Sequence, residues 1–245
     1  MMHERRTIKI MLEDFWRPAV MPYIKWNSLN KLLSKYYEIE LSNNPDFLLY
    51  SSFGYEHLKY KCLRIFYTGE NVRPNFEECD YAFSFDYPIT ERNYRLPIYR
   101  LYPSYQKLLE PRSSKEILGH DRKFCCFLAS NSQGKVRNKF FELLSSYKKI
   151  DAGGKLFFNV EEPVPRGKEI EWMSQYKFCL AFENSSYPGY TTEKLTNALA
   201  AGTIPIYWGN PIVERDFNTS SFINCHEFAS LEEVVDHVIQ ADQDP

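Results

Sequence analysis

The feature that most constrains the fold is the stretch Phe178–Asn210, FCLAFENSSYPGYTTEKLTNALAAGTIPIYWGN. It predicts an apolar strand over residues 178–182, a polar loop, a helix over residues 192–201 and a second strand over residues 203–207. Such apolar strands need cover on both faces, which is the condition of a parallel sheet. Gly202 is expected to end the helix, because glycine readily adopts the left-handed conformation of a C′ residue. The stretch therefore predicts an α/β fold.

The same alternation of strand and helix extends along the chain. Further strands are expected at residues 7–12, 46–51, 61–67, 80–85 and 123–130, helices at 136–147 and 170–176, and an amphipathic stretch at 231–239. The chain of 245 residues is long enough for two compact halves. Between Tyr102 and His120 it turns polar and rich in proline and serine, which marks a junction. We therefore expect two Rossmann-like domains facing a cleft, residues 1–112 and residues 113–245.

Composition excludes several classes of protein. Hydrophobic residues make up 44% and charged residues 25%, so a packed core is expected and intrinsic disorder is not. A formal net charge of -2 gives no general attraction for nucleic acid. The six cysteines form no CxxC pair, which argues against zinc, and their apolar surroundings favour buried, reduced thiols. A reducing, cytoplasmic location is the simplest interpretation. The sequence has no apolar run long enough to span a membrane.

An anion site is expected where the strand of residues 178–182 ends. In open α/β sheets ligands bind beyond the carboxyl ends of the strands, where Glu183 and the loop up to Thr192 follow. The free N–H groups and dipole of the next helix favour an anion. Lys194, in its first turn, opposes that dipole unless a diphosphate compensates its charge. The alternative is a solvated lysine paired with a nearby carboxylate.

Arg137 is the second candidate for anion binding. It lies near the start of the helix that follows an apolar strand and the loop SNSQGK, which repeats the same geometry, and its planar guanidinium suits phosphate oxygens. Glu183 requires a polar partner because it ends an apolar strand. It either binds a ribose or sugar hydroxyl or caps a neighbouring loop, and Asn184 and Tyr190 carry the same ambiguity.

Three motifs, in this order, resemble the α1,3/4-fucosyltransferase family, especially its bacterial members. They are FYTGENVRPNFEECDYAFSFD (residues 66–86), ASNSQGKVRNKFFELL (residues 129–144) and the run AFENSSYPGYTTEKLTNALAAGTIPIYWG that ends at Gly209. The resemblance implies the GT-B fold, with an amino-terminal acceptor domain and a carboxyl-terminal domain for the donor GDP-fucose. It also implies inversion at the anomeric carbon, with no metal ion and no separate cofactor.

The same resemblance assigns roles to individual residues. Arg137 and Lys194 are similar to the cations that contact the donor diphosphate. Glu193 is similar to a contact of the donor sugar, and we count it among the catalytic residues as well. Asn184 and Tyr190 are expected to line the nucleotide-sugar pocket, with Glu183 beside them. The expected acceptor is a GlcNAc-containing glycan of the N-acetyllactosamine type, the linkage α1,3.

The chain departs from the family where a general base is required. Related bacterial enzymes place a glutamate shortly after the FD that ends the fourth strand, whereas this chain reads FDYPITERNYRLPIY. The candidates are Asp86 and Glu91. Glu91 is slightly favoured, because Asp86 precedes Tyr87 and Pro88 and suits an Asx-type turn.

A second departure is length. The family continues with a further helical segment, so we expect that segment to be missing here, together with the tail through which some relatives associate with the inner face of the membrane. Two rival functions stay open: a non-catalytic GDP-sugar-binding module, and a transferase that uses another GDP-sugar. Aromatic residues that could stack on an acceptor sugar or simply pack are Trp16, Trp26, Tyr36 and Tyr37.

Overall fold

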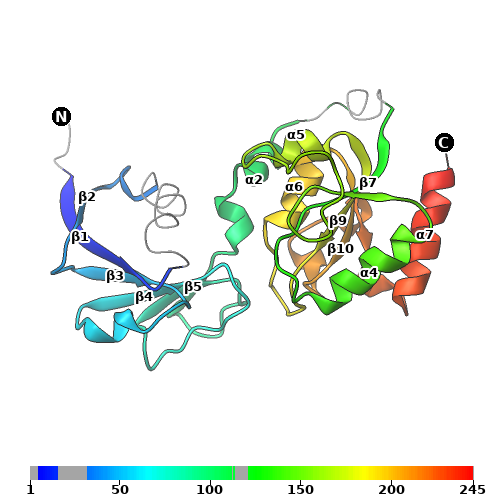
Figure 1. The fold of residues 1–245 in the computed structure, drawn as a ribbon. Coiled ribbons are helices and arrows are strands. Elements are labelled where there is room, and N and C mark those ends of the chain that lie inside the picture. The colour runs from blue at the N-terminus through cyan, green and yellow to red at the C-terminus, as the bar shows by residue number, and fades with distance from the viewer. Residues whose placement is uncertain (1–4, 16–31, 112, 114–120, 245) are drawn as a thin grey trace. The chain divides into compact units, whose positions relative to one another are not determined.

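The structure is a computed structural model that describes residues 5–15, 32–111, 113 and 121–244. The chain divides into two compact units, residues 1–101 and residues 102–245, each built on one parallel sheet (Figure 1). The short helix α2 (Pro103–Leu108) belongs to the second unit, where the hydroxyls of Ser104 and Thr196 lie 3.0 Å apart. The domain limits predicted at residues 112 and 113 fall in a stretch that is described only in part, and they stay a prediction.

The first unit contains a sheet in the order β2-β1-β3-β4-β5-β6, with every neighbouring pair parallel. Its strands are β1 (Arg6–Glu13), β2 (Tyr37–Leu41), β3 (Phe47–Tyr50), β4 (Leu63–Tyr67), β5 (Tyr81–Ser84) and β6 (Asn93–Arg95). Two 3₁₀ helices accompany them, η1 (Glu56–Lys59) and η2 (Ile98–Leu101). The four strands predicted in this half are confirmed as β1, β3, β4 and β5.

The apolar runs of β3 and β4 are covered on both faces, as the sequence pattern predicts. Leu48, Tyr50 and Phe66 contribute to a core on one face of the sheet. Leu49 and Tyr67 contribute to a core on the other face. Because side chains alternate between the faces of a strand, two cores require a nearly continuous apolar sequence.

The second unit contains a sheet in the order β11-β10-β9-β7-β8, again all parallel. Its strands are β7 (Lys123–Phe127), β8 (Ile150–Ala152), β9 (Tyr176–Phe182), β10 (Ile204–Trp208) and β11 (Ile223–Asn224). Besides α2, its α-helices are α4 (Lys135–Ser145), α5 (Glu169–Met173), α6 (Glu193–Ala201) and α7 (Leu231–Gln243). Three 3₁₀ helices complete it: η3 (Val213–Arg215), η4 (Thr219–Ser221) and η5 (Cys225–Glu227).

The strand and helix predictions for this half are confirmed, with shifted limits. Tyr176, predicted to end a helix, begins β9 instead, because it pairs with Lys123 in the parallel ladder. Gly202 follows α6 with a φ of 73°, the left-handed conformation that was expected of it. The structure also contains strands that were not predicted, β2, β6, β8 and β11.

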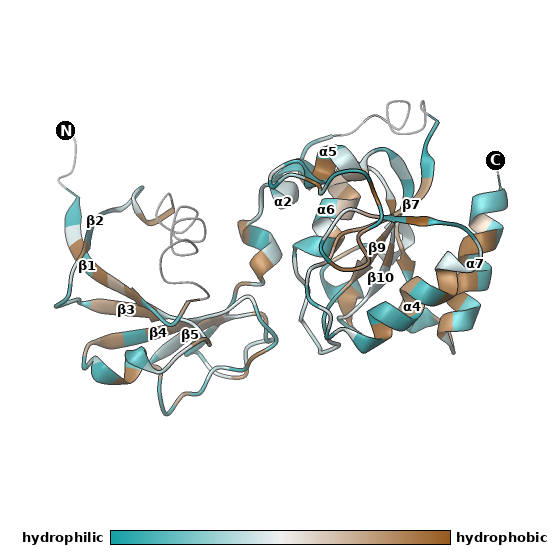
Figure 2. Cartoon of the chain, viewed as in Figure 1, coloured by the Kyte–Doolittle hydropathy of each residue, from teal (hydrophilic) through white to brown (hydrophobic). Residues whose placement is uncertain are grey.

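Helices cover both faces of the second sheet. One core packs Phe140 and Leu144 of α4 and Val234 of α7 against the sheet, and Phe140 stacks on Phe182 with 4.8 Å between ring centroids. The other core contains Leu195 and other residues of α6. Figure 2 shows apolar and polar residues alternating along α4 and α7, as expected for helices with one face on a sheet. Within the described ranges no helix combines the length and apolar character needed to cross a membrane.

Candidate functional site

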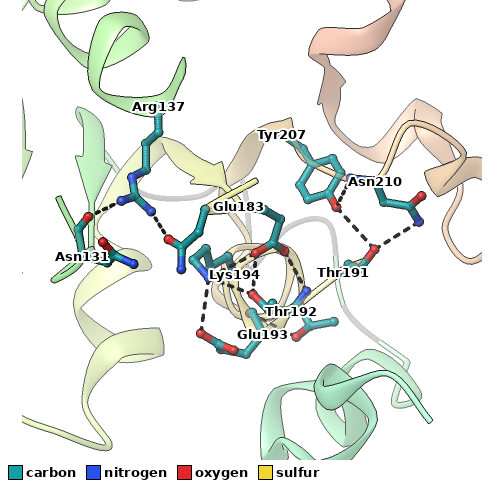
Figure 3. Close-up of polar contacts among 11 residues, drawn as sticks. Asn131, Arg137, Glu183, Thr191, Thr192, Glu193, Lys194, Tyr207 and Asn210 are labelled. Atoms are coloured by element: carbon teal, nitrogen blue, oxygen red, sulfur yellow. Dashed lines mark hydrogen bonds and ion pairs between the residues drawn. The ribbon is translucent and has the colours of Figure 1, made fainter. Parts of the chain in front are cut away.

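A cluster of polar residues in the second unit lies at the carboxyl ends of its central strands. Glu183 and Asn184 follow β9 directly, and the N–H of Glu183 donates to the carbonyl of Trp208, at the end of β10, over 2.8 Å. The cluster also includes the start of α6 and Arg137 of α4, as Figure 3 shows. The structure therefore brings Arg137, Glu183, Asn184 and Lys194 together, as the sequence predicts.

Arg137 is almost fully buried, with 1% of its surface exposed. Its Nη1 donates to Oδ1 of Asn184 over 2.6 Å, and its Nη2 donates to the backbone carbonyl of Asn131. Its Nε is buried and has no hydrogen-bond partner among the described residues. Burial lowers the pKa of the guanidinium, and the charge of Glu183 partly offsets that. Since arginine remains protonated in proteins, this is a buried cation with a donor to spare.

Gly134, directly before α4, lies closely against that guanidinium. A Cβ at this position would lie 2.9 Å from the Cζ of Arg137. The helix also starts without a side-chain cap. The loop therefore holds Arg137 tightly and leaves the first N–H groups of α4 without side-chain acceptors.

Lys194 belongs to a compact network with a buried carboxylate. Its Nζ lies 3.1 Å from Oε2 of Glu183 and 2.9 Å from the hydroxyl of Thr192. Oε1 of Glu193 is 3.8 Å from the same nitrogen. The pKa of Lys194 is raised, because Glu183 and Glu193 outweigh the desolvation that would lower it. The ammonium is therefore charged and held in place.

Glu183 has no exposed surface, and burial raises its pKa, which Lys194 opposes. Its Oε1 accepts from the N–H of Thr192 over 2.7 Å, and its Oε2 accepts from the Thr192 hydroxyl over 2.7 Å. Of the two roles that the sequence left open, these contacts favour the one in which Glu183 caps the neighbouring loop.

The start of α6 has no side-chain cap. Thr192 is its N-cap residue, yet its side chain makes no capping bond; its hydroxyl donates to Glu183 and accepts from the ammonium of Lys194. The first N–H groups of the helix therefore have no capping side chain as their acceptor, at the positive end of the helix dipole. This is the arrangement in which helices bind phosphates.

A second set of buried polar residues braces the loop that leads to α6. Oδ1 of Asn210 accepts from the N–H of Gly189 over 2.8 Å, and its Nδ2 donates to the hydroxyl of Thr191 over 3.2 Å. The hydroxyl of Tyr207 accepts from the N–H of Asn210 over 3.0 Å. Tyr190 is buried in the same loop, with 2% exposed. Sequence reasoning missed Asn210, although its place just after a strand was a usable signal.

Gly209, which lies beside Glu183, and His226, which bonds to Gly209, were not singled out for this purpose either. A Cβ at Gly209 would lie 2.8 Å from Cβ of Glu183 and closer still to its Cγ, so only glycine fits. The Gly209 N–H donates to Nε2 of His226 over 3.3 Å. Burial lowers the pKa of His226. Its neutral ring thus serves as an acceptor next to the site.

In the first unit the two carboxylates predicted as general bases lie at opposite ends of the strands. Asp86 is at the carboxyl end of β5, and Glu91 is near the amino end of β6. Asp86 follows β5 and its Oδ2 lies 3.1 Å from Nε of Arg73. Since β6 is parallel to β5 and Asn93 pairs with Ala82, the chain returns to the amino-terminal edge before β6. Glu91 lies on that return and is exposed.

The pKa of Asp86 is raised by burial, which Arg73 and Arg95 partly offset. Of the aromatic residues expected near an acceptor, Trp16 and Trp26 lie outside the described residues. Tyr36 is 67% exposed, and Tyr37 is exposed as well. Across the parts of the chain that are described, no group of three or more His, Cys, Asp or Glu residues could hold a metal ion.

Comparisons with known proteins agree on one family. Residues 10–102 match the sequence model described as the alpha-(1,3)-fucosyltransferase FucT N-terminal domain. Residues 118–245 match the model described as glycosyltransferase family 10 (fucosyltransferase) C-term. The chain is 32% identical over 279 aligned residues to the alpha-(1,3)-fucosyltransferase FucT of Helicobacter pylori, which covers 94% of the chain and 56% of that protein. It is 35% identical over 112 residues to the human 3-galactosyl-N-acetylglucosaminide 4-alpha-L-fucosyltransferase, covering 44% of the chain and 30% of that protein.

The solved structures give the same answer for the fold. A crystal structure of an alpha1,3-fucosyltransferase with GDP-fucose superposes with a TM-score of 0.82 at 31% identity, over 100% of the chain and 81% of that structure. A second alpha1,3-fucosyltransferase crystal structure gives 0.85 at 30% identity, over 100% and 80%. The chain thus spans little more than half of the curated bacterial relative and has the GT-B fold of two Rossmann-like domains. It belongs to glycosyltransferase family 10, the fucosyltransferases.

Proposed function

We propose that the chain transfers L-fucose from GDP-fucose, with inversion, to a hydroxyl of a GlcNAc-containing acceptor glycan, in α1,3 linkage. The observation that carries the proposal is the pair Arg137 and Lys194, two cations at the uncapped starts of two helices of one sheet. Arg137 keeps an unused buried donor, and a buried cation with a free N–H suits an anion. The relatives that match along the chain are named for fucose transfer.

The geometry supports a role in stabilising the leaving group. As the acceptor oxygen forms its bond to the anomeric carbon, the bond from that carbon to the diphosphate breaks and leaves its electron pair on the diphosphate. Arg137, Lys194 and the first N–H groups of α6 would meet that developing charge. Because these groups are held in place before reaction, little reorganisation is needed. The proposed donor contacts also include Asn184 and Tyr190, in the loop before α6, and Glu193, the first residue of α6. We propose Glu193 as a catalytic residue near the sugar as well.

The proton of the acceptor hydroxyl has to pass to a base, and we propose Asp86 for this role in place of Glu91. Ligands of parallel sheets bind at the carboxyl edge, where Asp86 lies and Glu91 does not. Burial also raises the pKa of Asp86, as suits a carboxylate that must accept a proton.

The test is release of GDP from GDP-fucose with and without N-acetyllactosamine. We expect release that depends on the acceptor, and its loss in the double variant Arg137→Ala/Lys194→Ala, which should also bind GDP at least about a hundredfold more weakly. The matched control is Lys139→Ala/Lys168→Ala, which removes two exposed lysines of the same unit. If the Arg137/Lys194 variant binds GDP as tightly as the parent, the assignment is wrong.

The same assay separates the rival functions. A non-catalytic GDP-sugar-binding module would bind GDP-fucose yet release no GDP when acceptor is added. A transferase for another sugar would prefer GDP-mannose over GDP-fucose at equal concentrations. Specificity between such donors depends on a few hydroxyl contacts, so the comparison has to be of kcat/KM for each donor.

A further inference from the structure

The carboxylate of Glu183 is fully occupied by donors of its own chain. It accepts from the N–H and the hydroxyl of Thr192, each over 2.7 Å, and from the ammonium of Lys194 over 3.1 Å. Both oxygens accept and neither faces another acceptor, so the group is ionised. Figure 3 shows its oxygens turned toward Thr192 and Lys194.

Glu183 cannot readily leave this position. Its backbone N–H is bonded to the carbonyl of Trp208, and its side chain packs directly on the bare Cα of Gly209. With no exposed surface, the carboxylate is not available to a bound sugar. It therefore acts on a ligand only through the residues that it touches.

Lys194, in contrast, can reach a ligand. One-fifth of its side chain is exposed, and an ammonium has three donors. Two of these donors are used, by Glu183 and by the Thr192 hydroxyl at 2.9 Å. The carboxylate of Glu193, 3.8 Å away, is beyond hydrogen-bond distance. One donor of Lys194 is left for an anion at the start of α6.

We propose that Glu183 is a positioning residue that serves as the counterion of Lys194 and competes with the donor diphosphate for its charge. The inference rests on the proposed function of this site and deepens it. Before the donor binds, Glu183 keeps the ammonium beside the helix start. When GDP is formed, Glu183 shares the ammonium with the diphosphate and so weakens the hold on the product.

Removing the charge of Glu183 has a consequence that simple damage to the site would not have. In Glu183→Gln the ammonium loses its internal counterion, and a bound diphosphate becomes its main partner. We expect GDP to bind roughly three- to tenfold more tightly, as for one charge contact at a partly buried site. We expect kcat to fall while the KM for GDP-fucose does not rise, because Lys194 is no longer held in advance and GDP leaves slowly.

The experiment is a double-mutant cycle on the full chain. The dissociation constant of GDP is measured by calorimetry for the parent, Glu183→Gln, Lys194→Met and the double variant, with turnover measured in parallel. If Glu183 acts through Lys194, the gain in GDP affinity is lost when Lys194 is Met. An equal gain in both backgrounds, or weaker GDP binding by Glu183→Gln, overturns the inference.

Two further variants serve as a control and as a substitute for Glu183→Gln. Glu171→Gln removes an exposed carboxylate paired with Lys168 and should leave GDP binding unchanged. If Glu183→Gln does not fold, Glu183→Asp retains the charge but withdraws it from Lys194, so tighter GDP binding is again expected and weaker binding again overturns the inference. Failure of the parent to bind GDP would reject the proposed function itself, whereas a parent that turns over with weaker binding by these variants rejects only the role of Glu183.

Discussion

The amide oxygen of Asn184 lies 2.6 Å from Nη1 of Arg137, which joins the loop after β9 to the first turn of α4. The bond fixes one edge of the guanidinium, and the carbonyl of Asn131 fixes the other. The buried Nε remains without a partner among the described residues. Asn184 thus orients the cation on which the proposed donor site depends.

Replacing Arg137 by Lys should weaken GDP binding about tenfold or more, because a point charge cannot keep both fixed bonds and still offer a planar fork to phosphate. Asn184→Ala should cost less, about threefold, since the charge stays and only its orientation is lost. Calorimetry with GDP measures both changes. Lys139→Ala, on the exposed side of the same helix, is the control. Equal affinities for the parent and Arg137→Lys would contradict the role of the guanidinium.

The pH dependence of turnover should report Asp86. Burial raises its pKa, and Arg73 and Arg95 partly offset this, so kcat/KM should fall as the pH drops through that raised value and the base becomes protonated. Arg73→Gln removes a cation that favours the ionised form, and the acid limb should move to higher pH, by about one unit at most because the pair is partly exposed.

Asp86→Asn should lower kcat by about 10² or more, the usual contribution of a general base. Glu91→Gln, an exposed carboxylate of the same connection, is its matched control and should leave the pH profile intact. The assignment of the base is reversed if Glu91→Gln loses activity and Asp86→Asn does not.

Acid should destabilise the second unit through His226. Burial lowers the pKa of its ring, whose Nε2 accepts the Gly209 N–H. The unfolded state therefore binds a proton more readily, so this stability is complete above about pH 6.5, the ordinary histidine value, and is lost as the pH falls through the lower folded pKa. His226→Gln offers a neutral acceptor, so its unfolding temperature should fall less between pH 7 and pH 5 than that of the parent. Identical slopes would show that His226 is not the group responsible.

Gly209→Ala should destabilise the protein by about 1–3 kcal/mol, the usual cost of forcing extra volume into a packed site, because the new Cβ would press on Glu183. It should also weaken GDP binding by displacing the network around Lys194. Gly167→Ala is the comparison, since its φ of +86° is strained for alanine while nothing lies within 4 Å. Chemical denaturation measures both stabilities, and unchanged GDP binding in Gly209→Ala would contradict the link to Glu183.

The sequence by itself determined the class of fold and pointed to the helix start at which we propose the donor site. A near-continuous apolar run such as that of β9 predicts a strand of a parallel sheet, because burial on both faces is a local requirement of each strand. The two ends of α6, including Gly202 after its last residue, can be predicted because helix ends follow local sequence rules. Lys194 stood out since its charge opposes the dipole of its own helix, a mismatch visible from neighbouring residues alone.

Only the tertiary structure decided which partners these residues take. Glu183 and Lys194 meet because a loop folds back from β9 to α6, and Gly209 is needed there because β10 brings its backbone against Glu183. Likewise, the sequence slightly favoured Glu91 because Asp86 suits an Asx-type turn, and the three-residue strand β6 is too short to leave a pattern that would place Glu91. Because β6 pairs with β5 in parallel, Asp86 lies at the carboxyl end of these strands and Glu91 at their amino end. Contacts between segments depend on how strands pair and cross, and local propensity carries no record of that pairing.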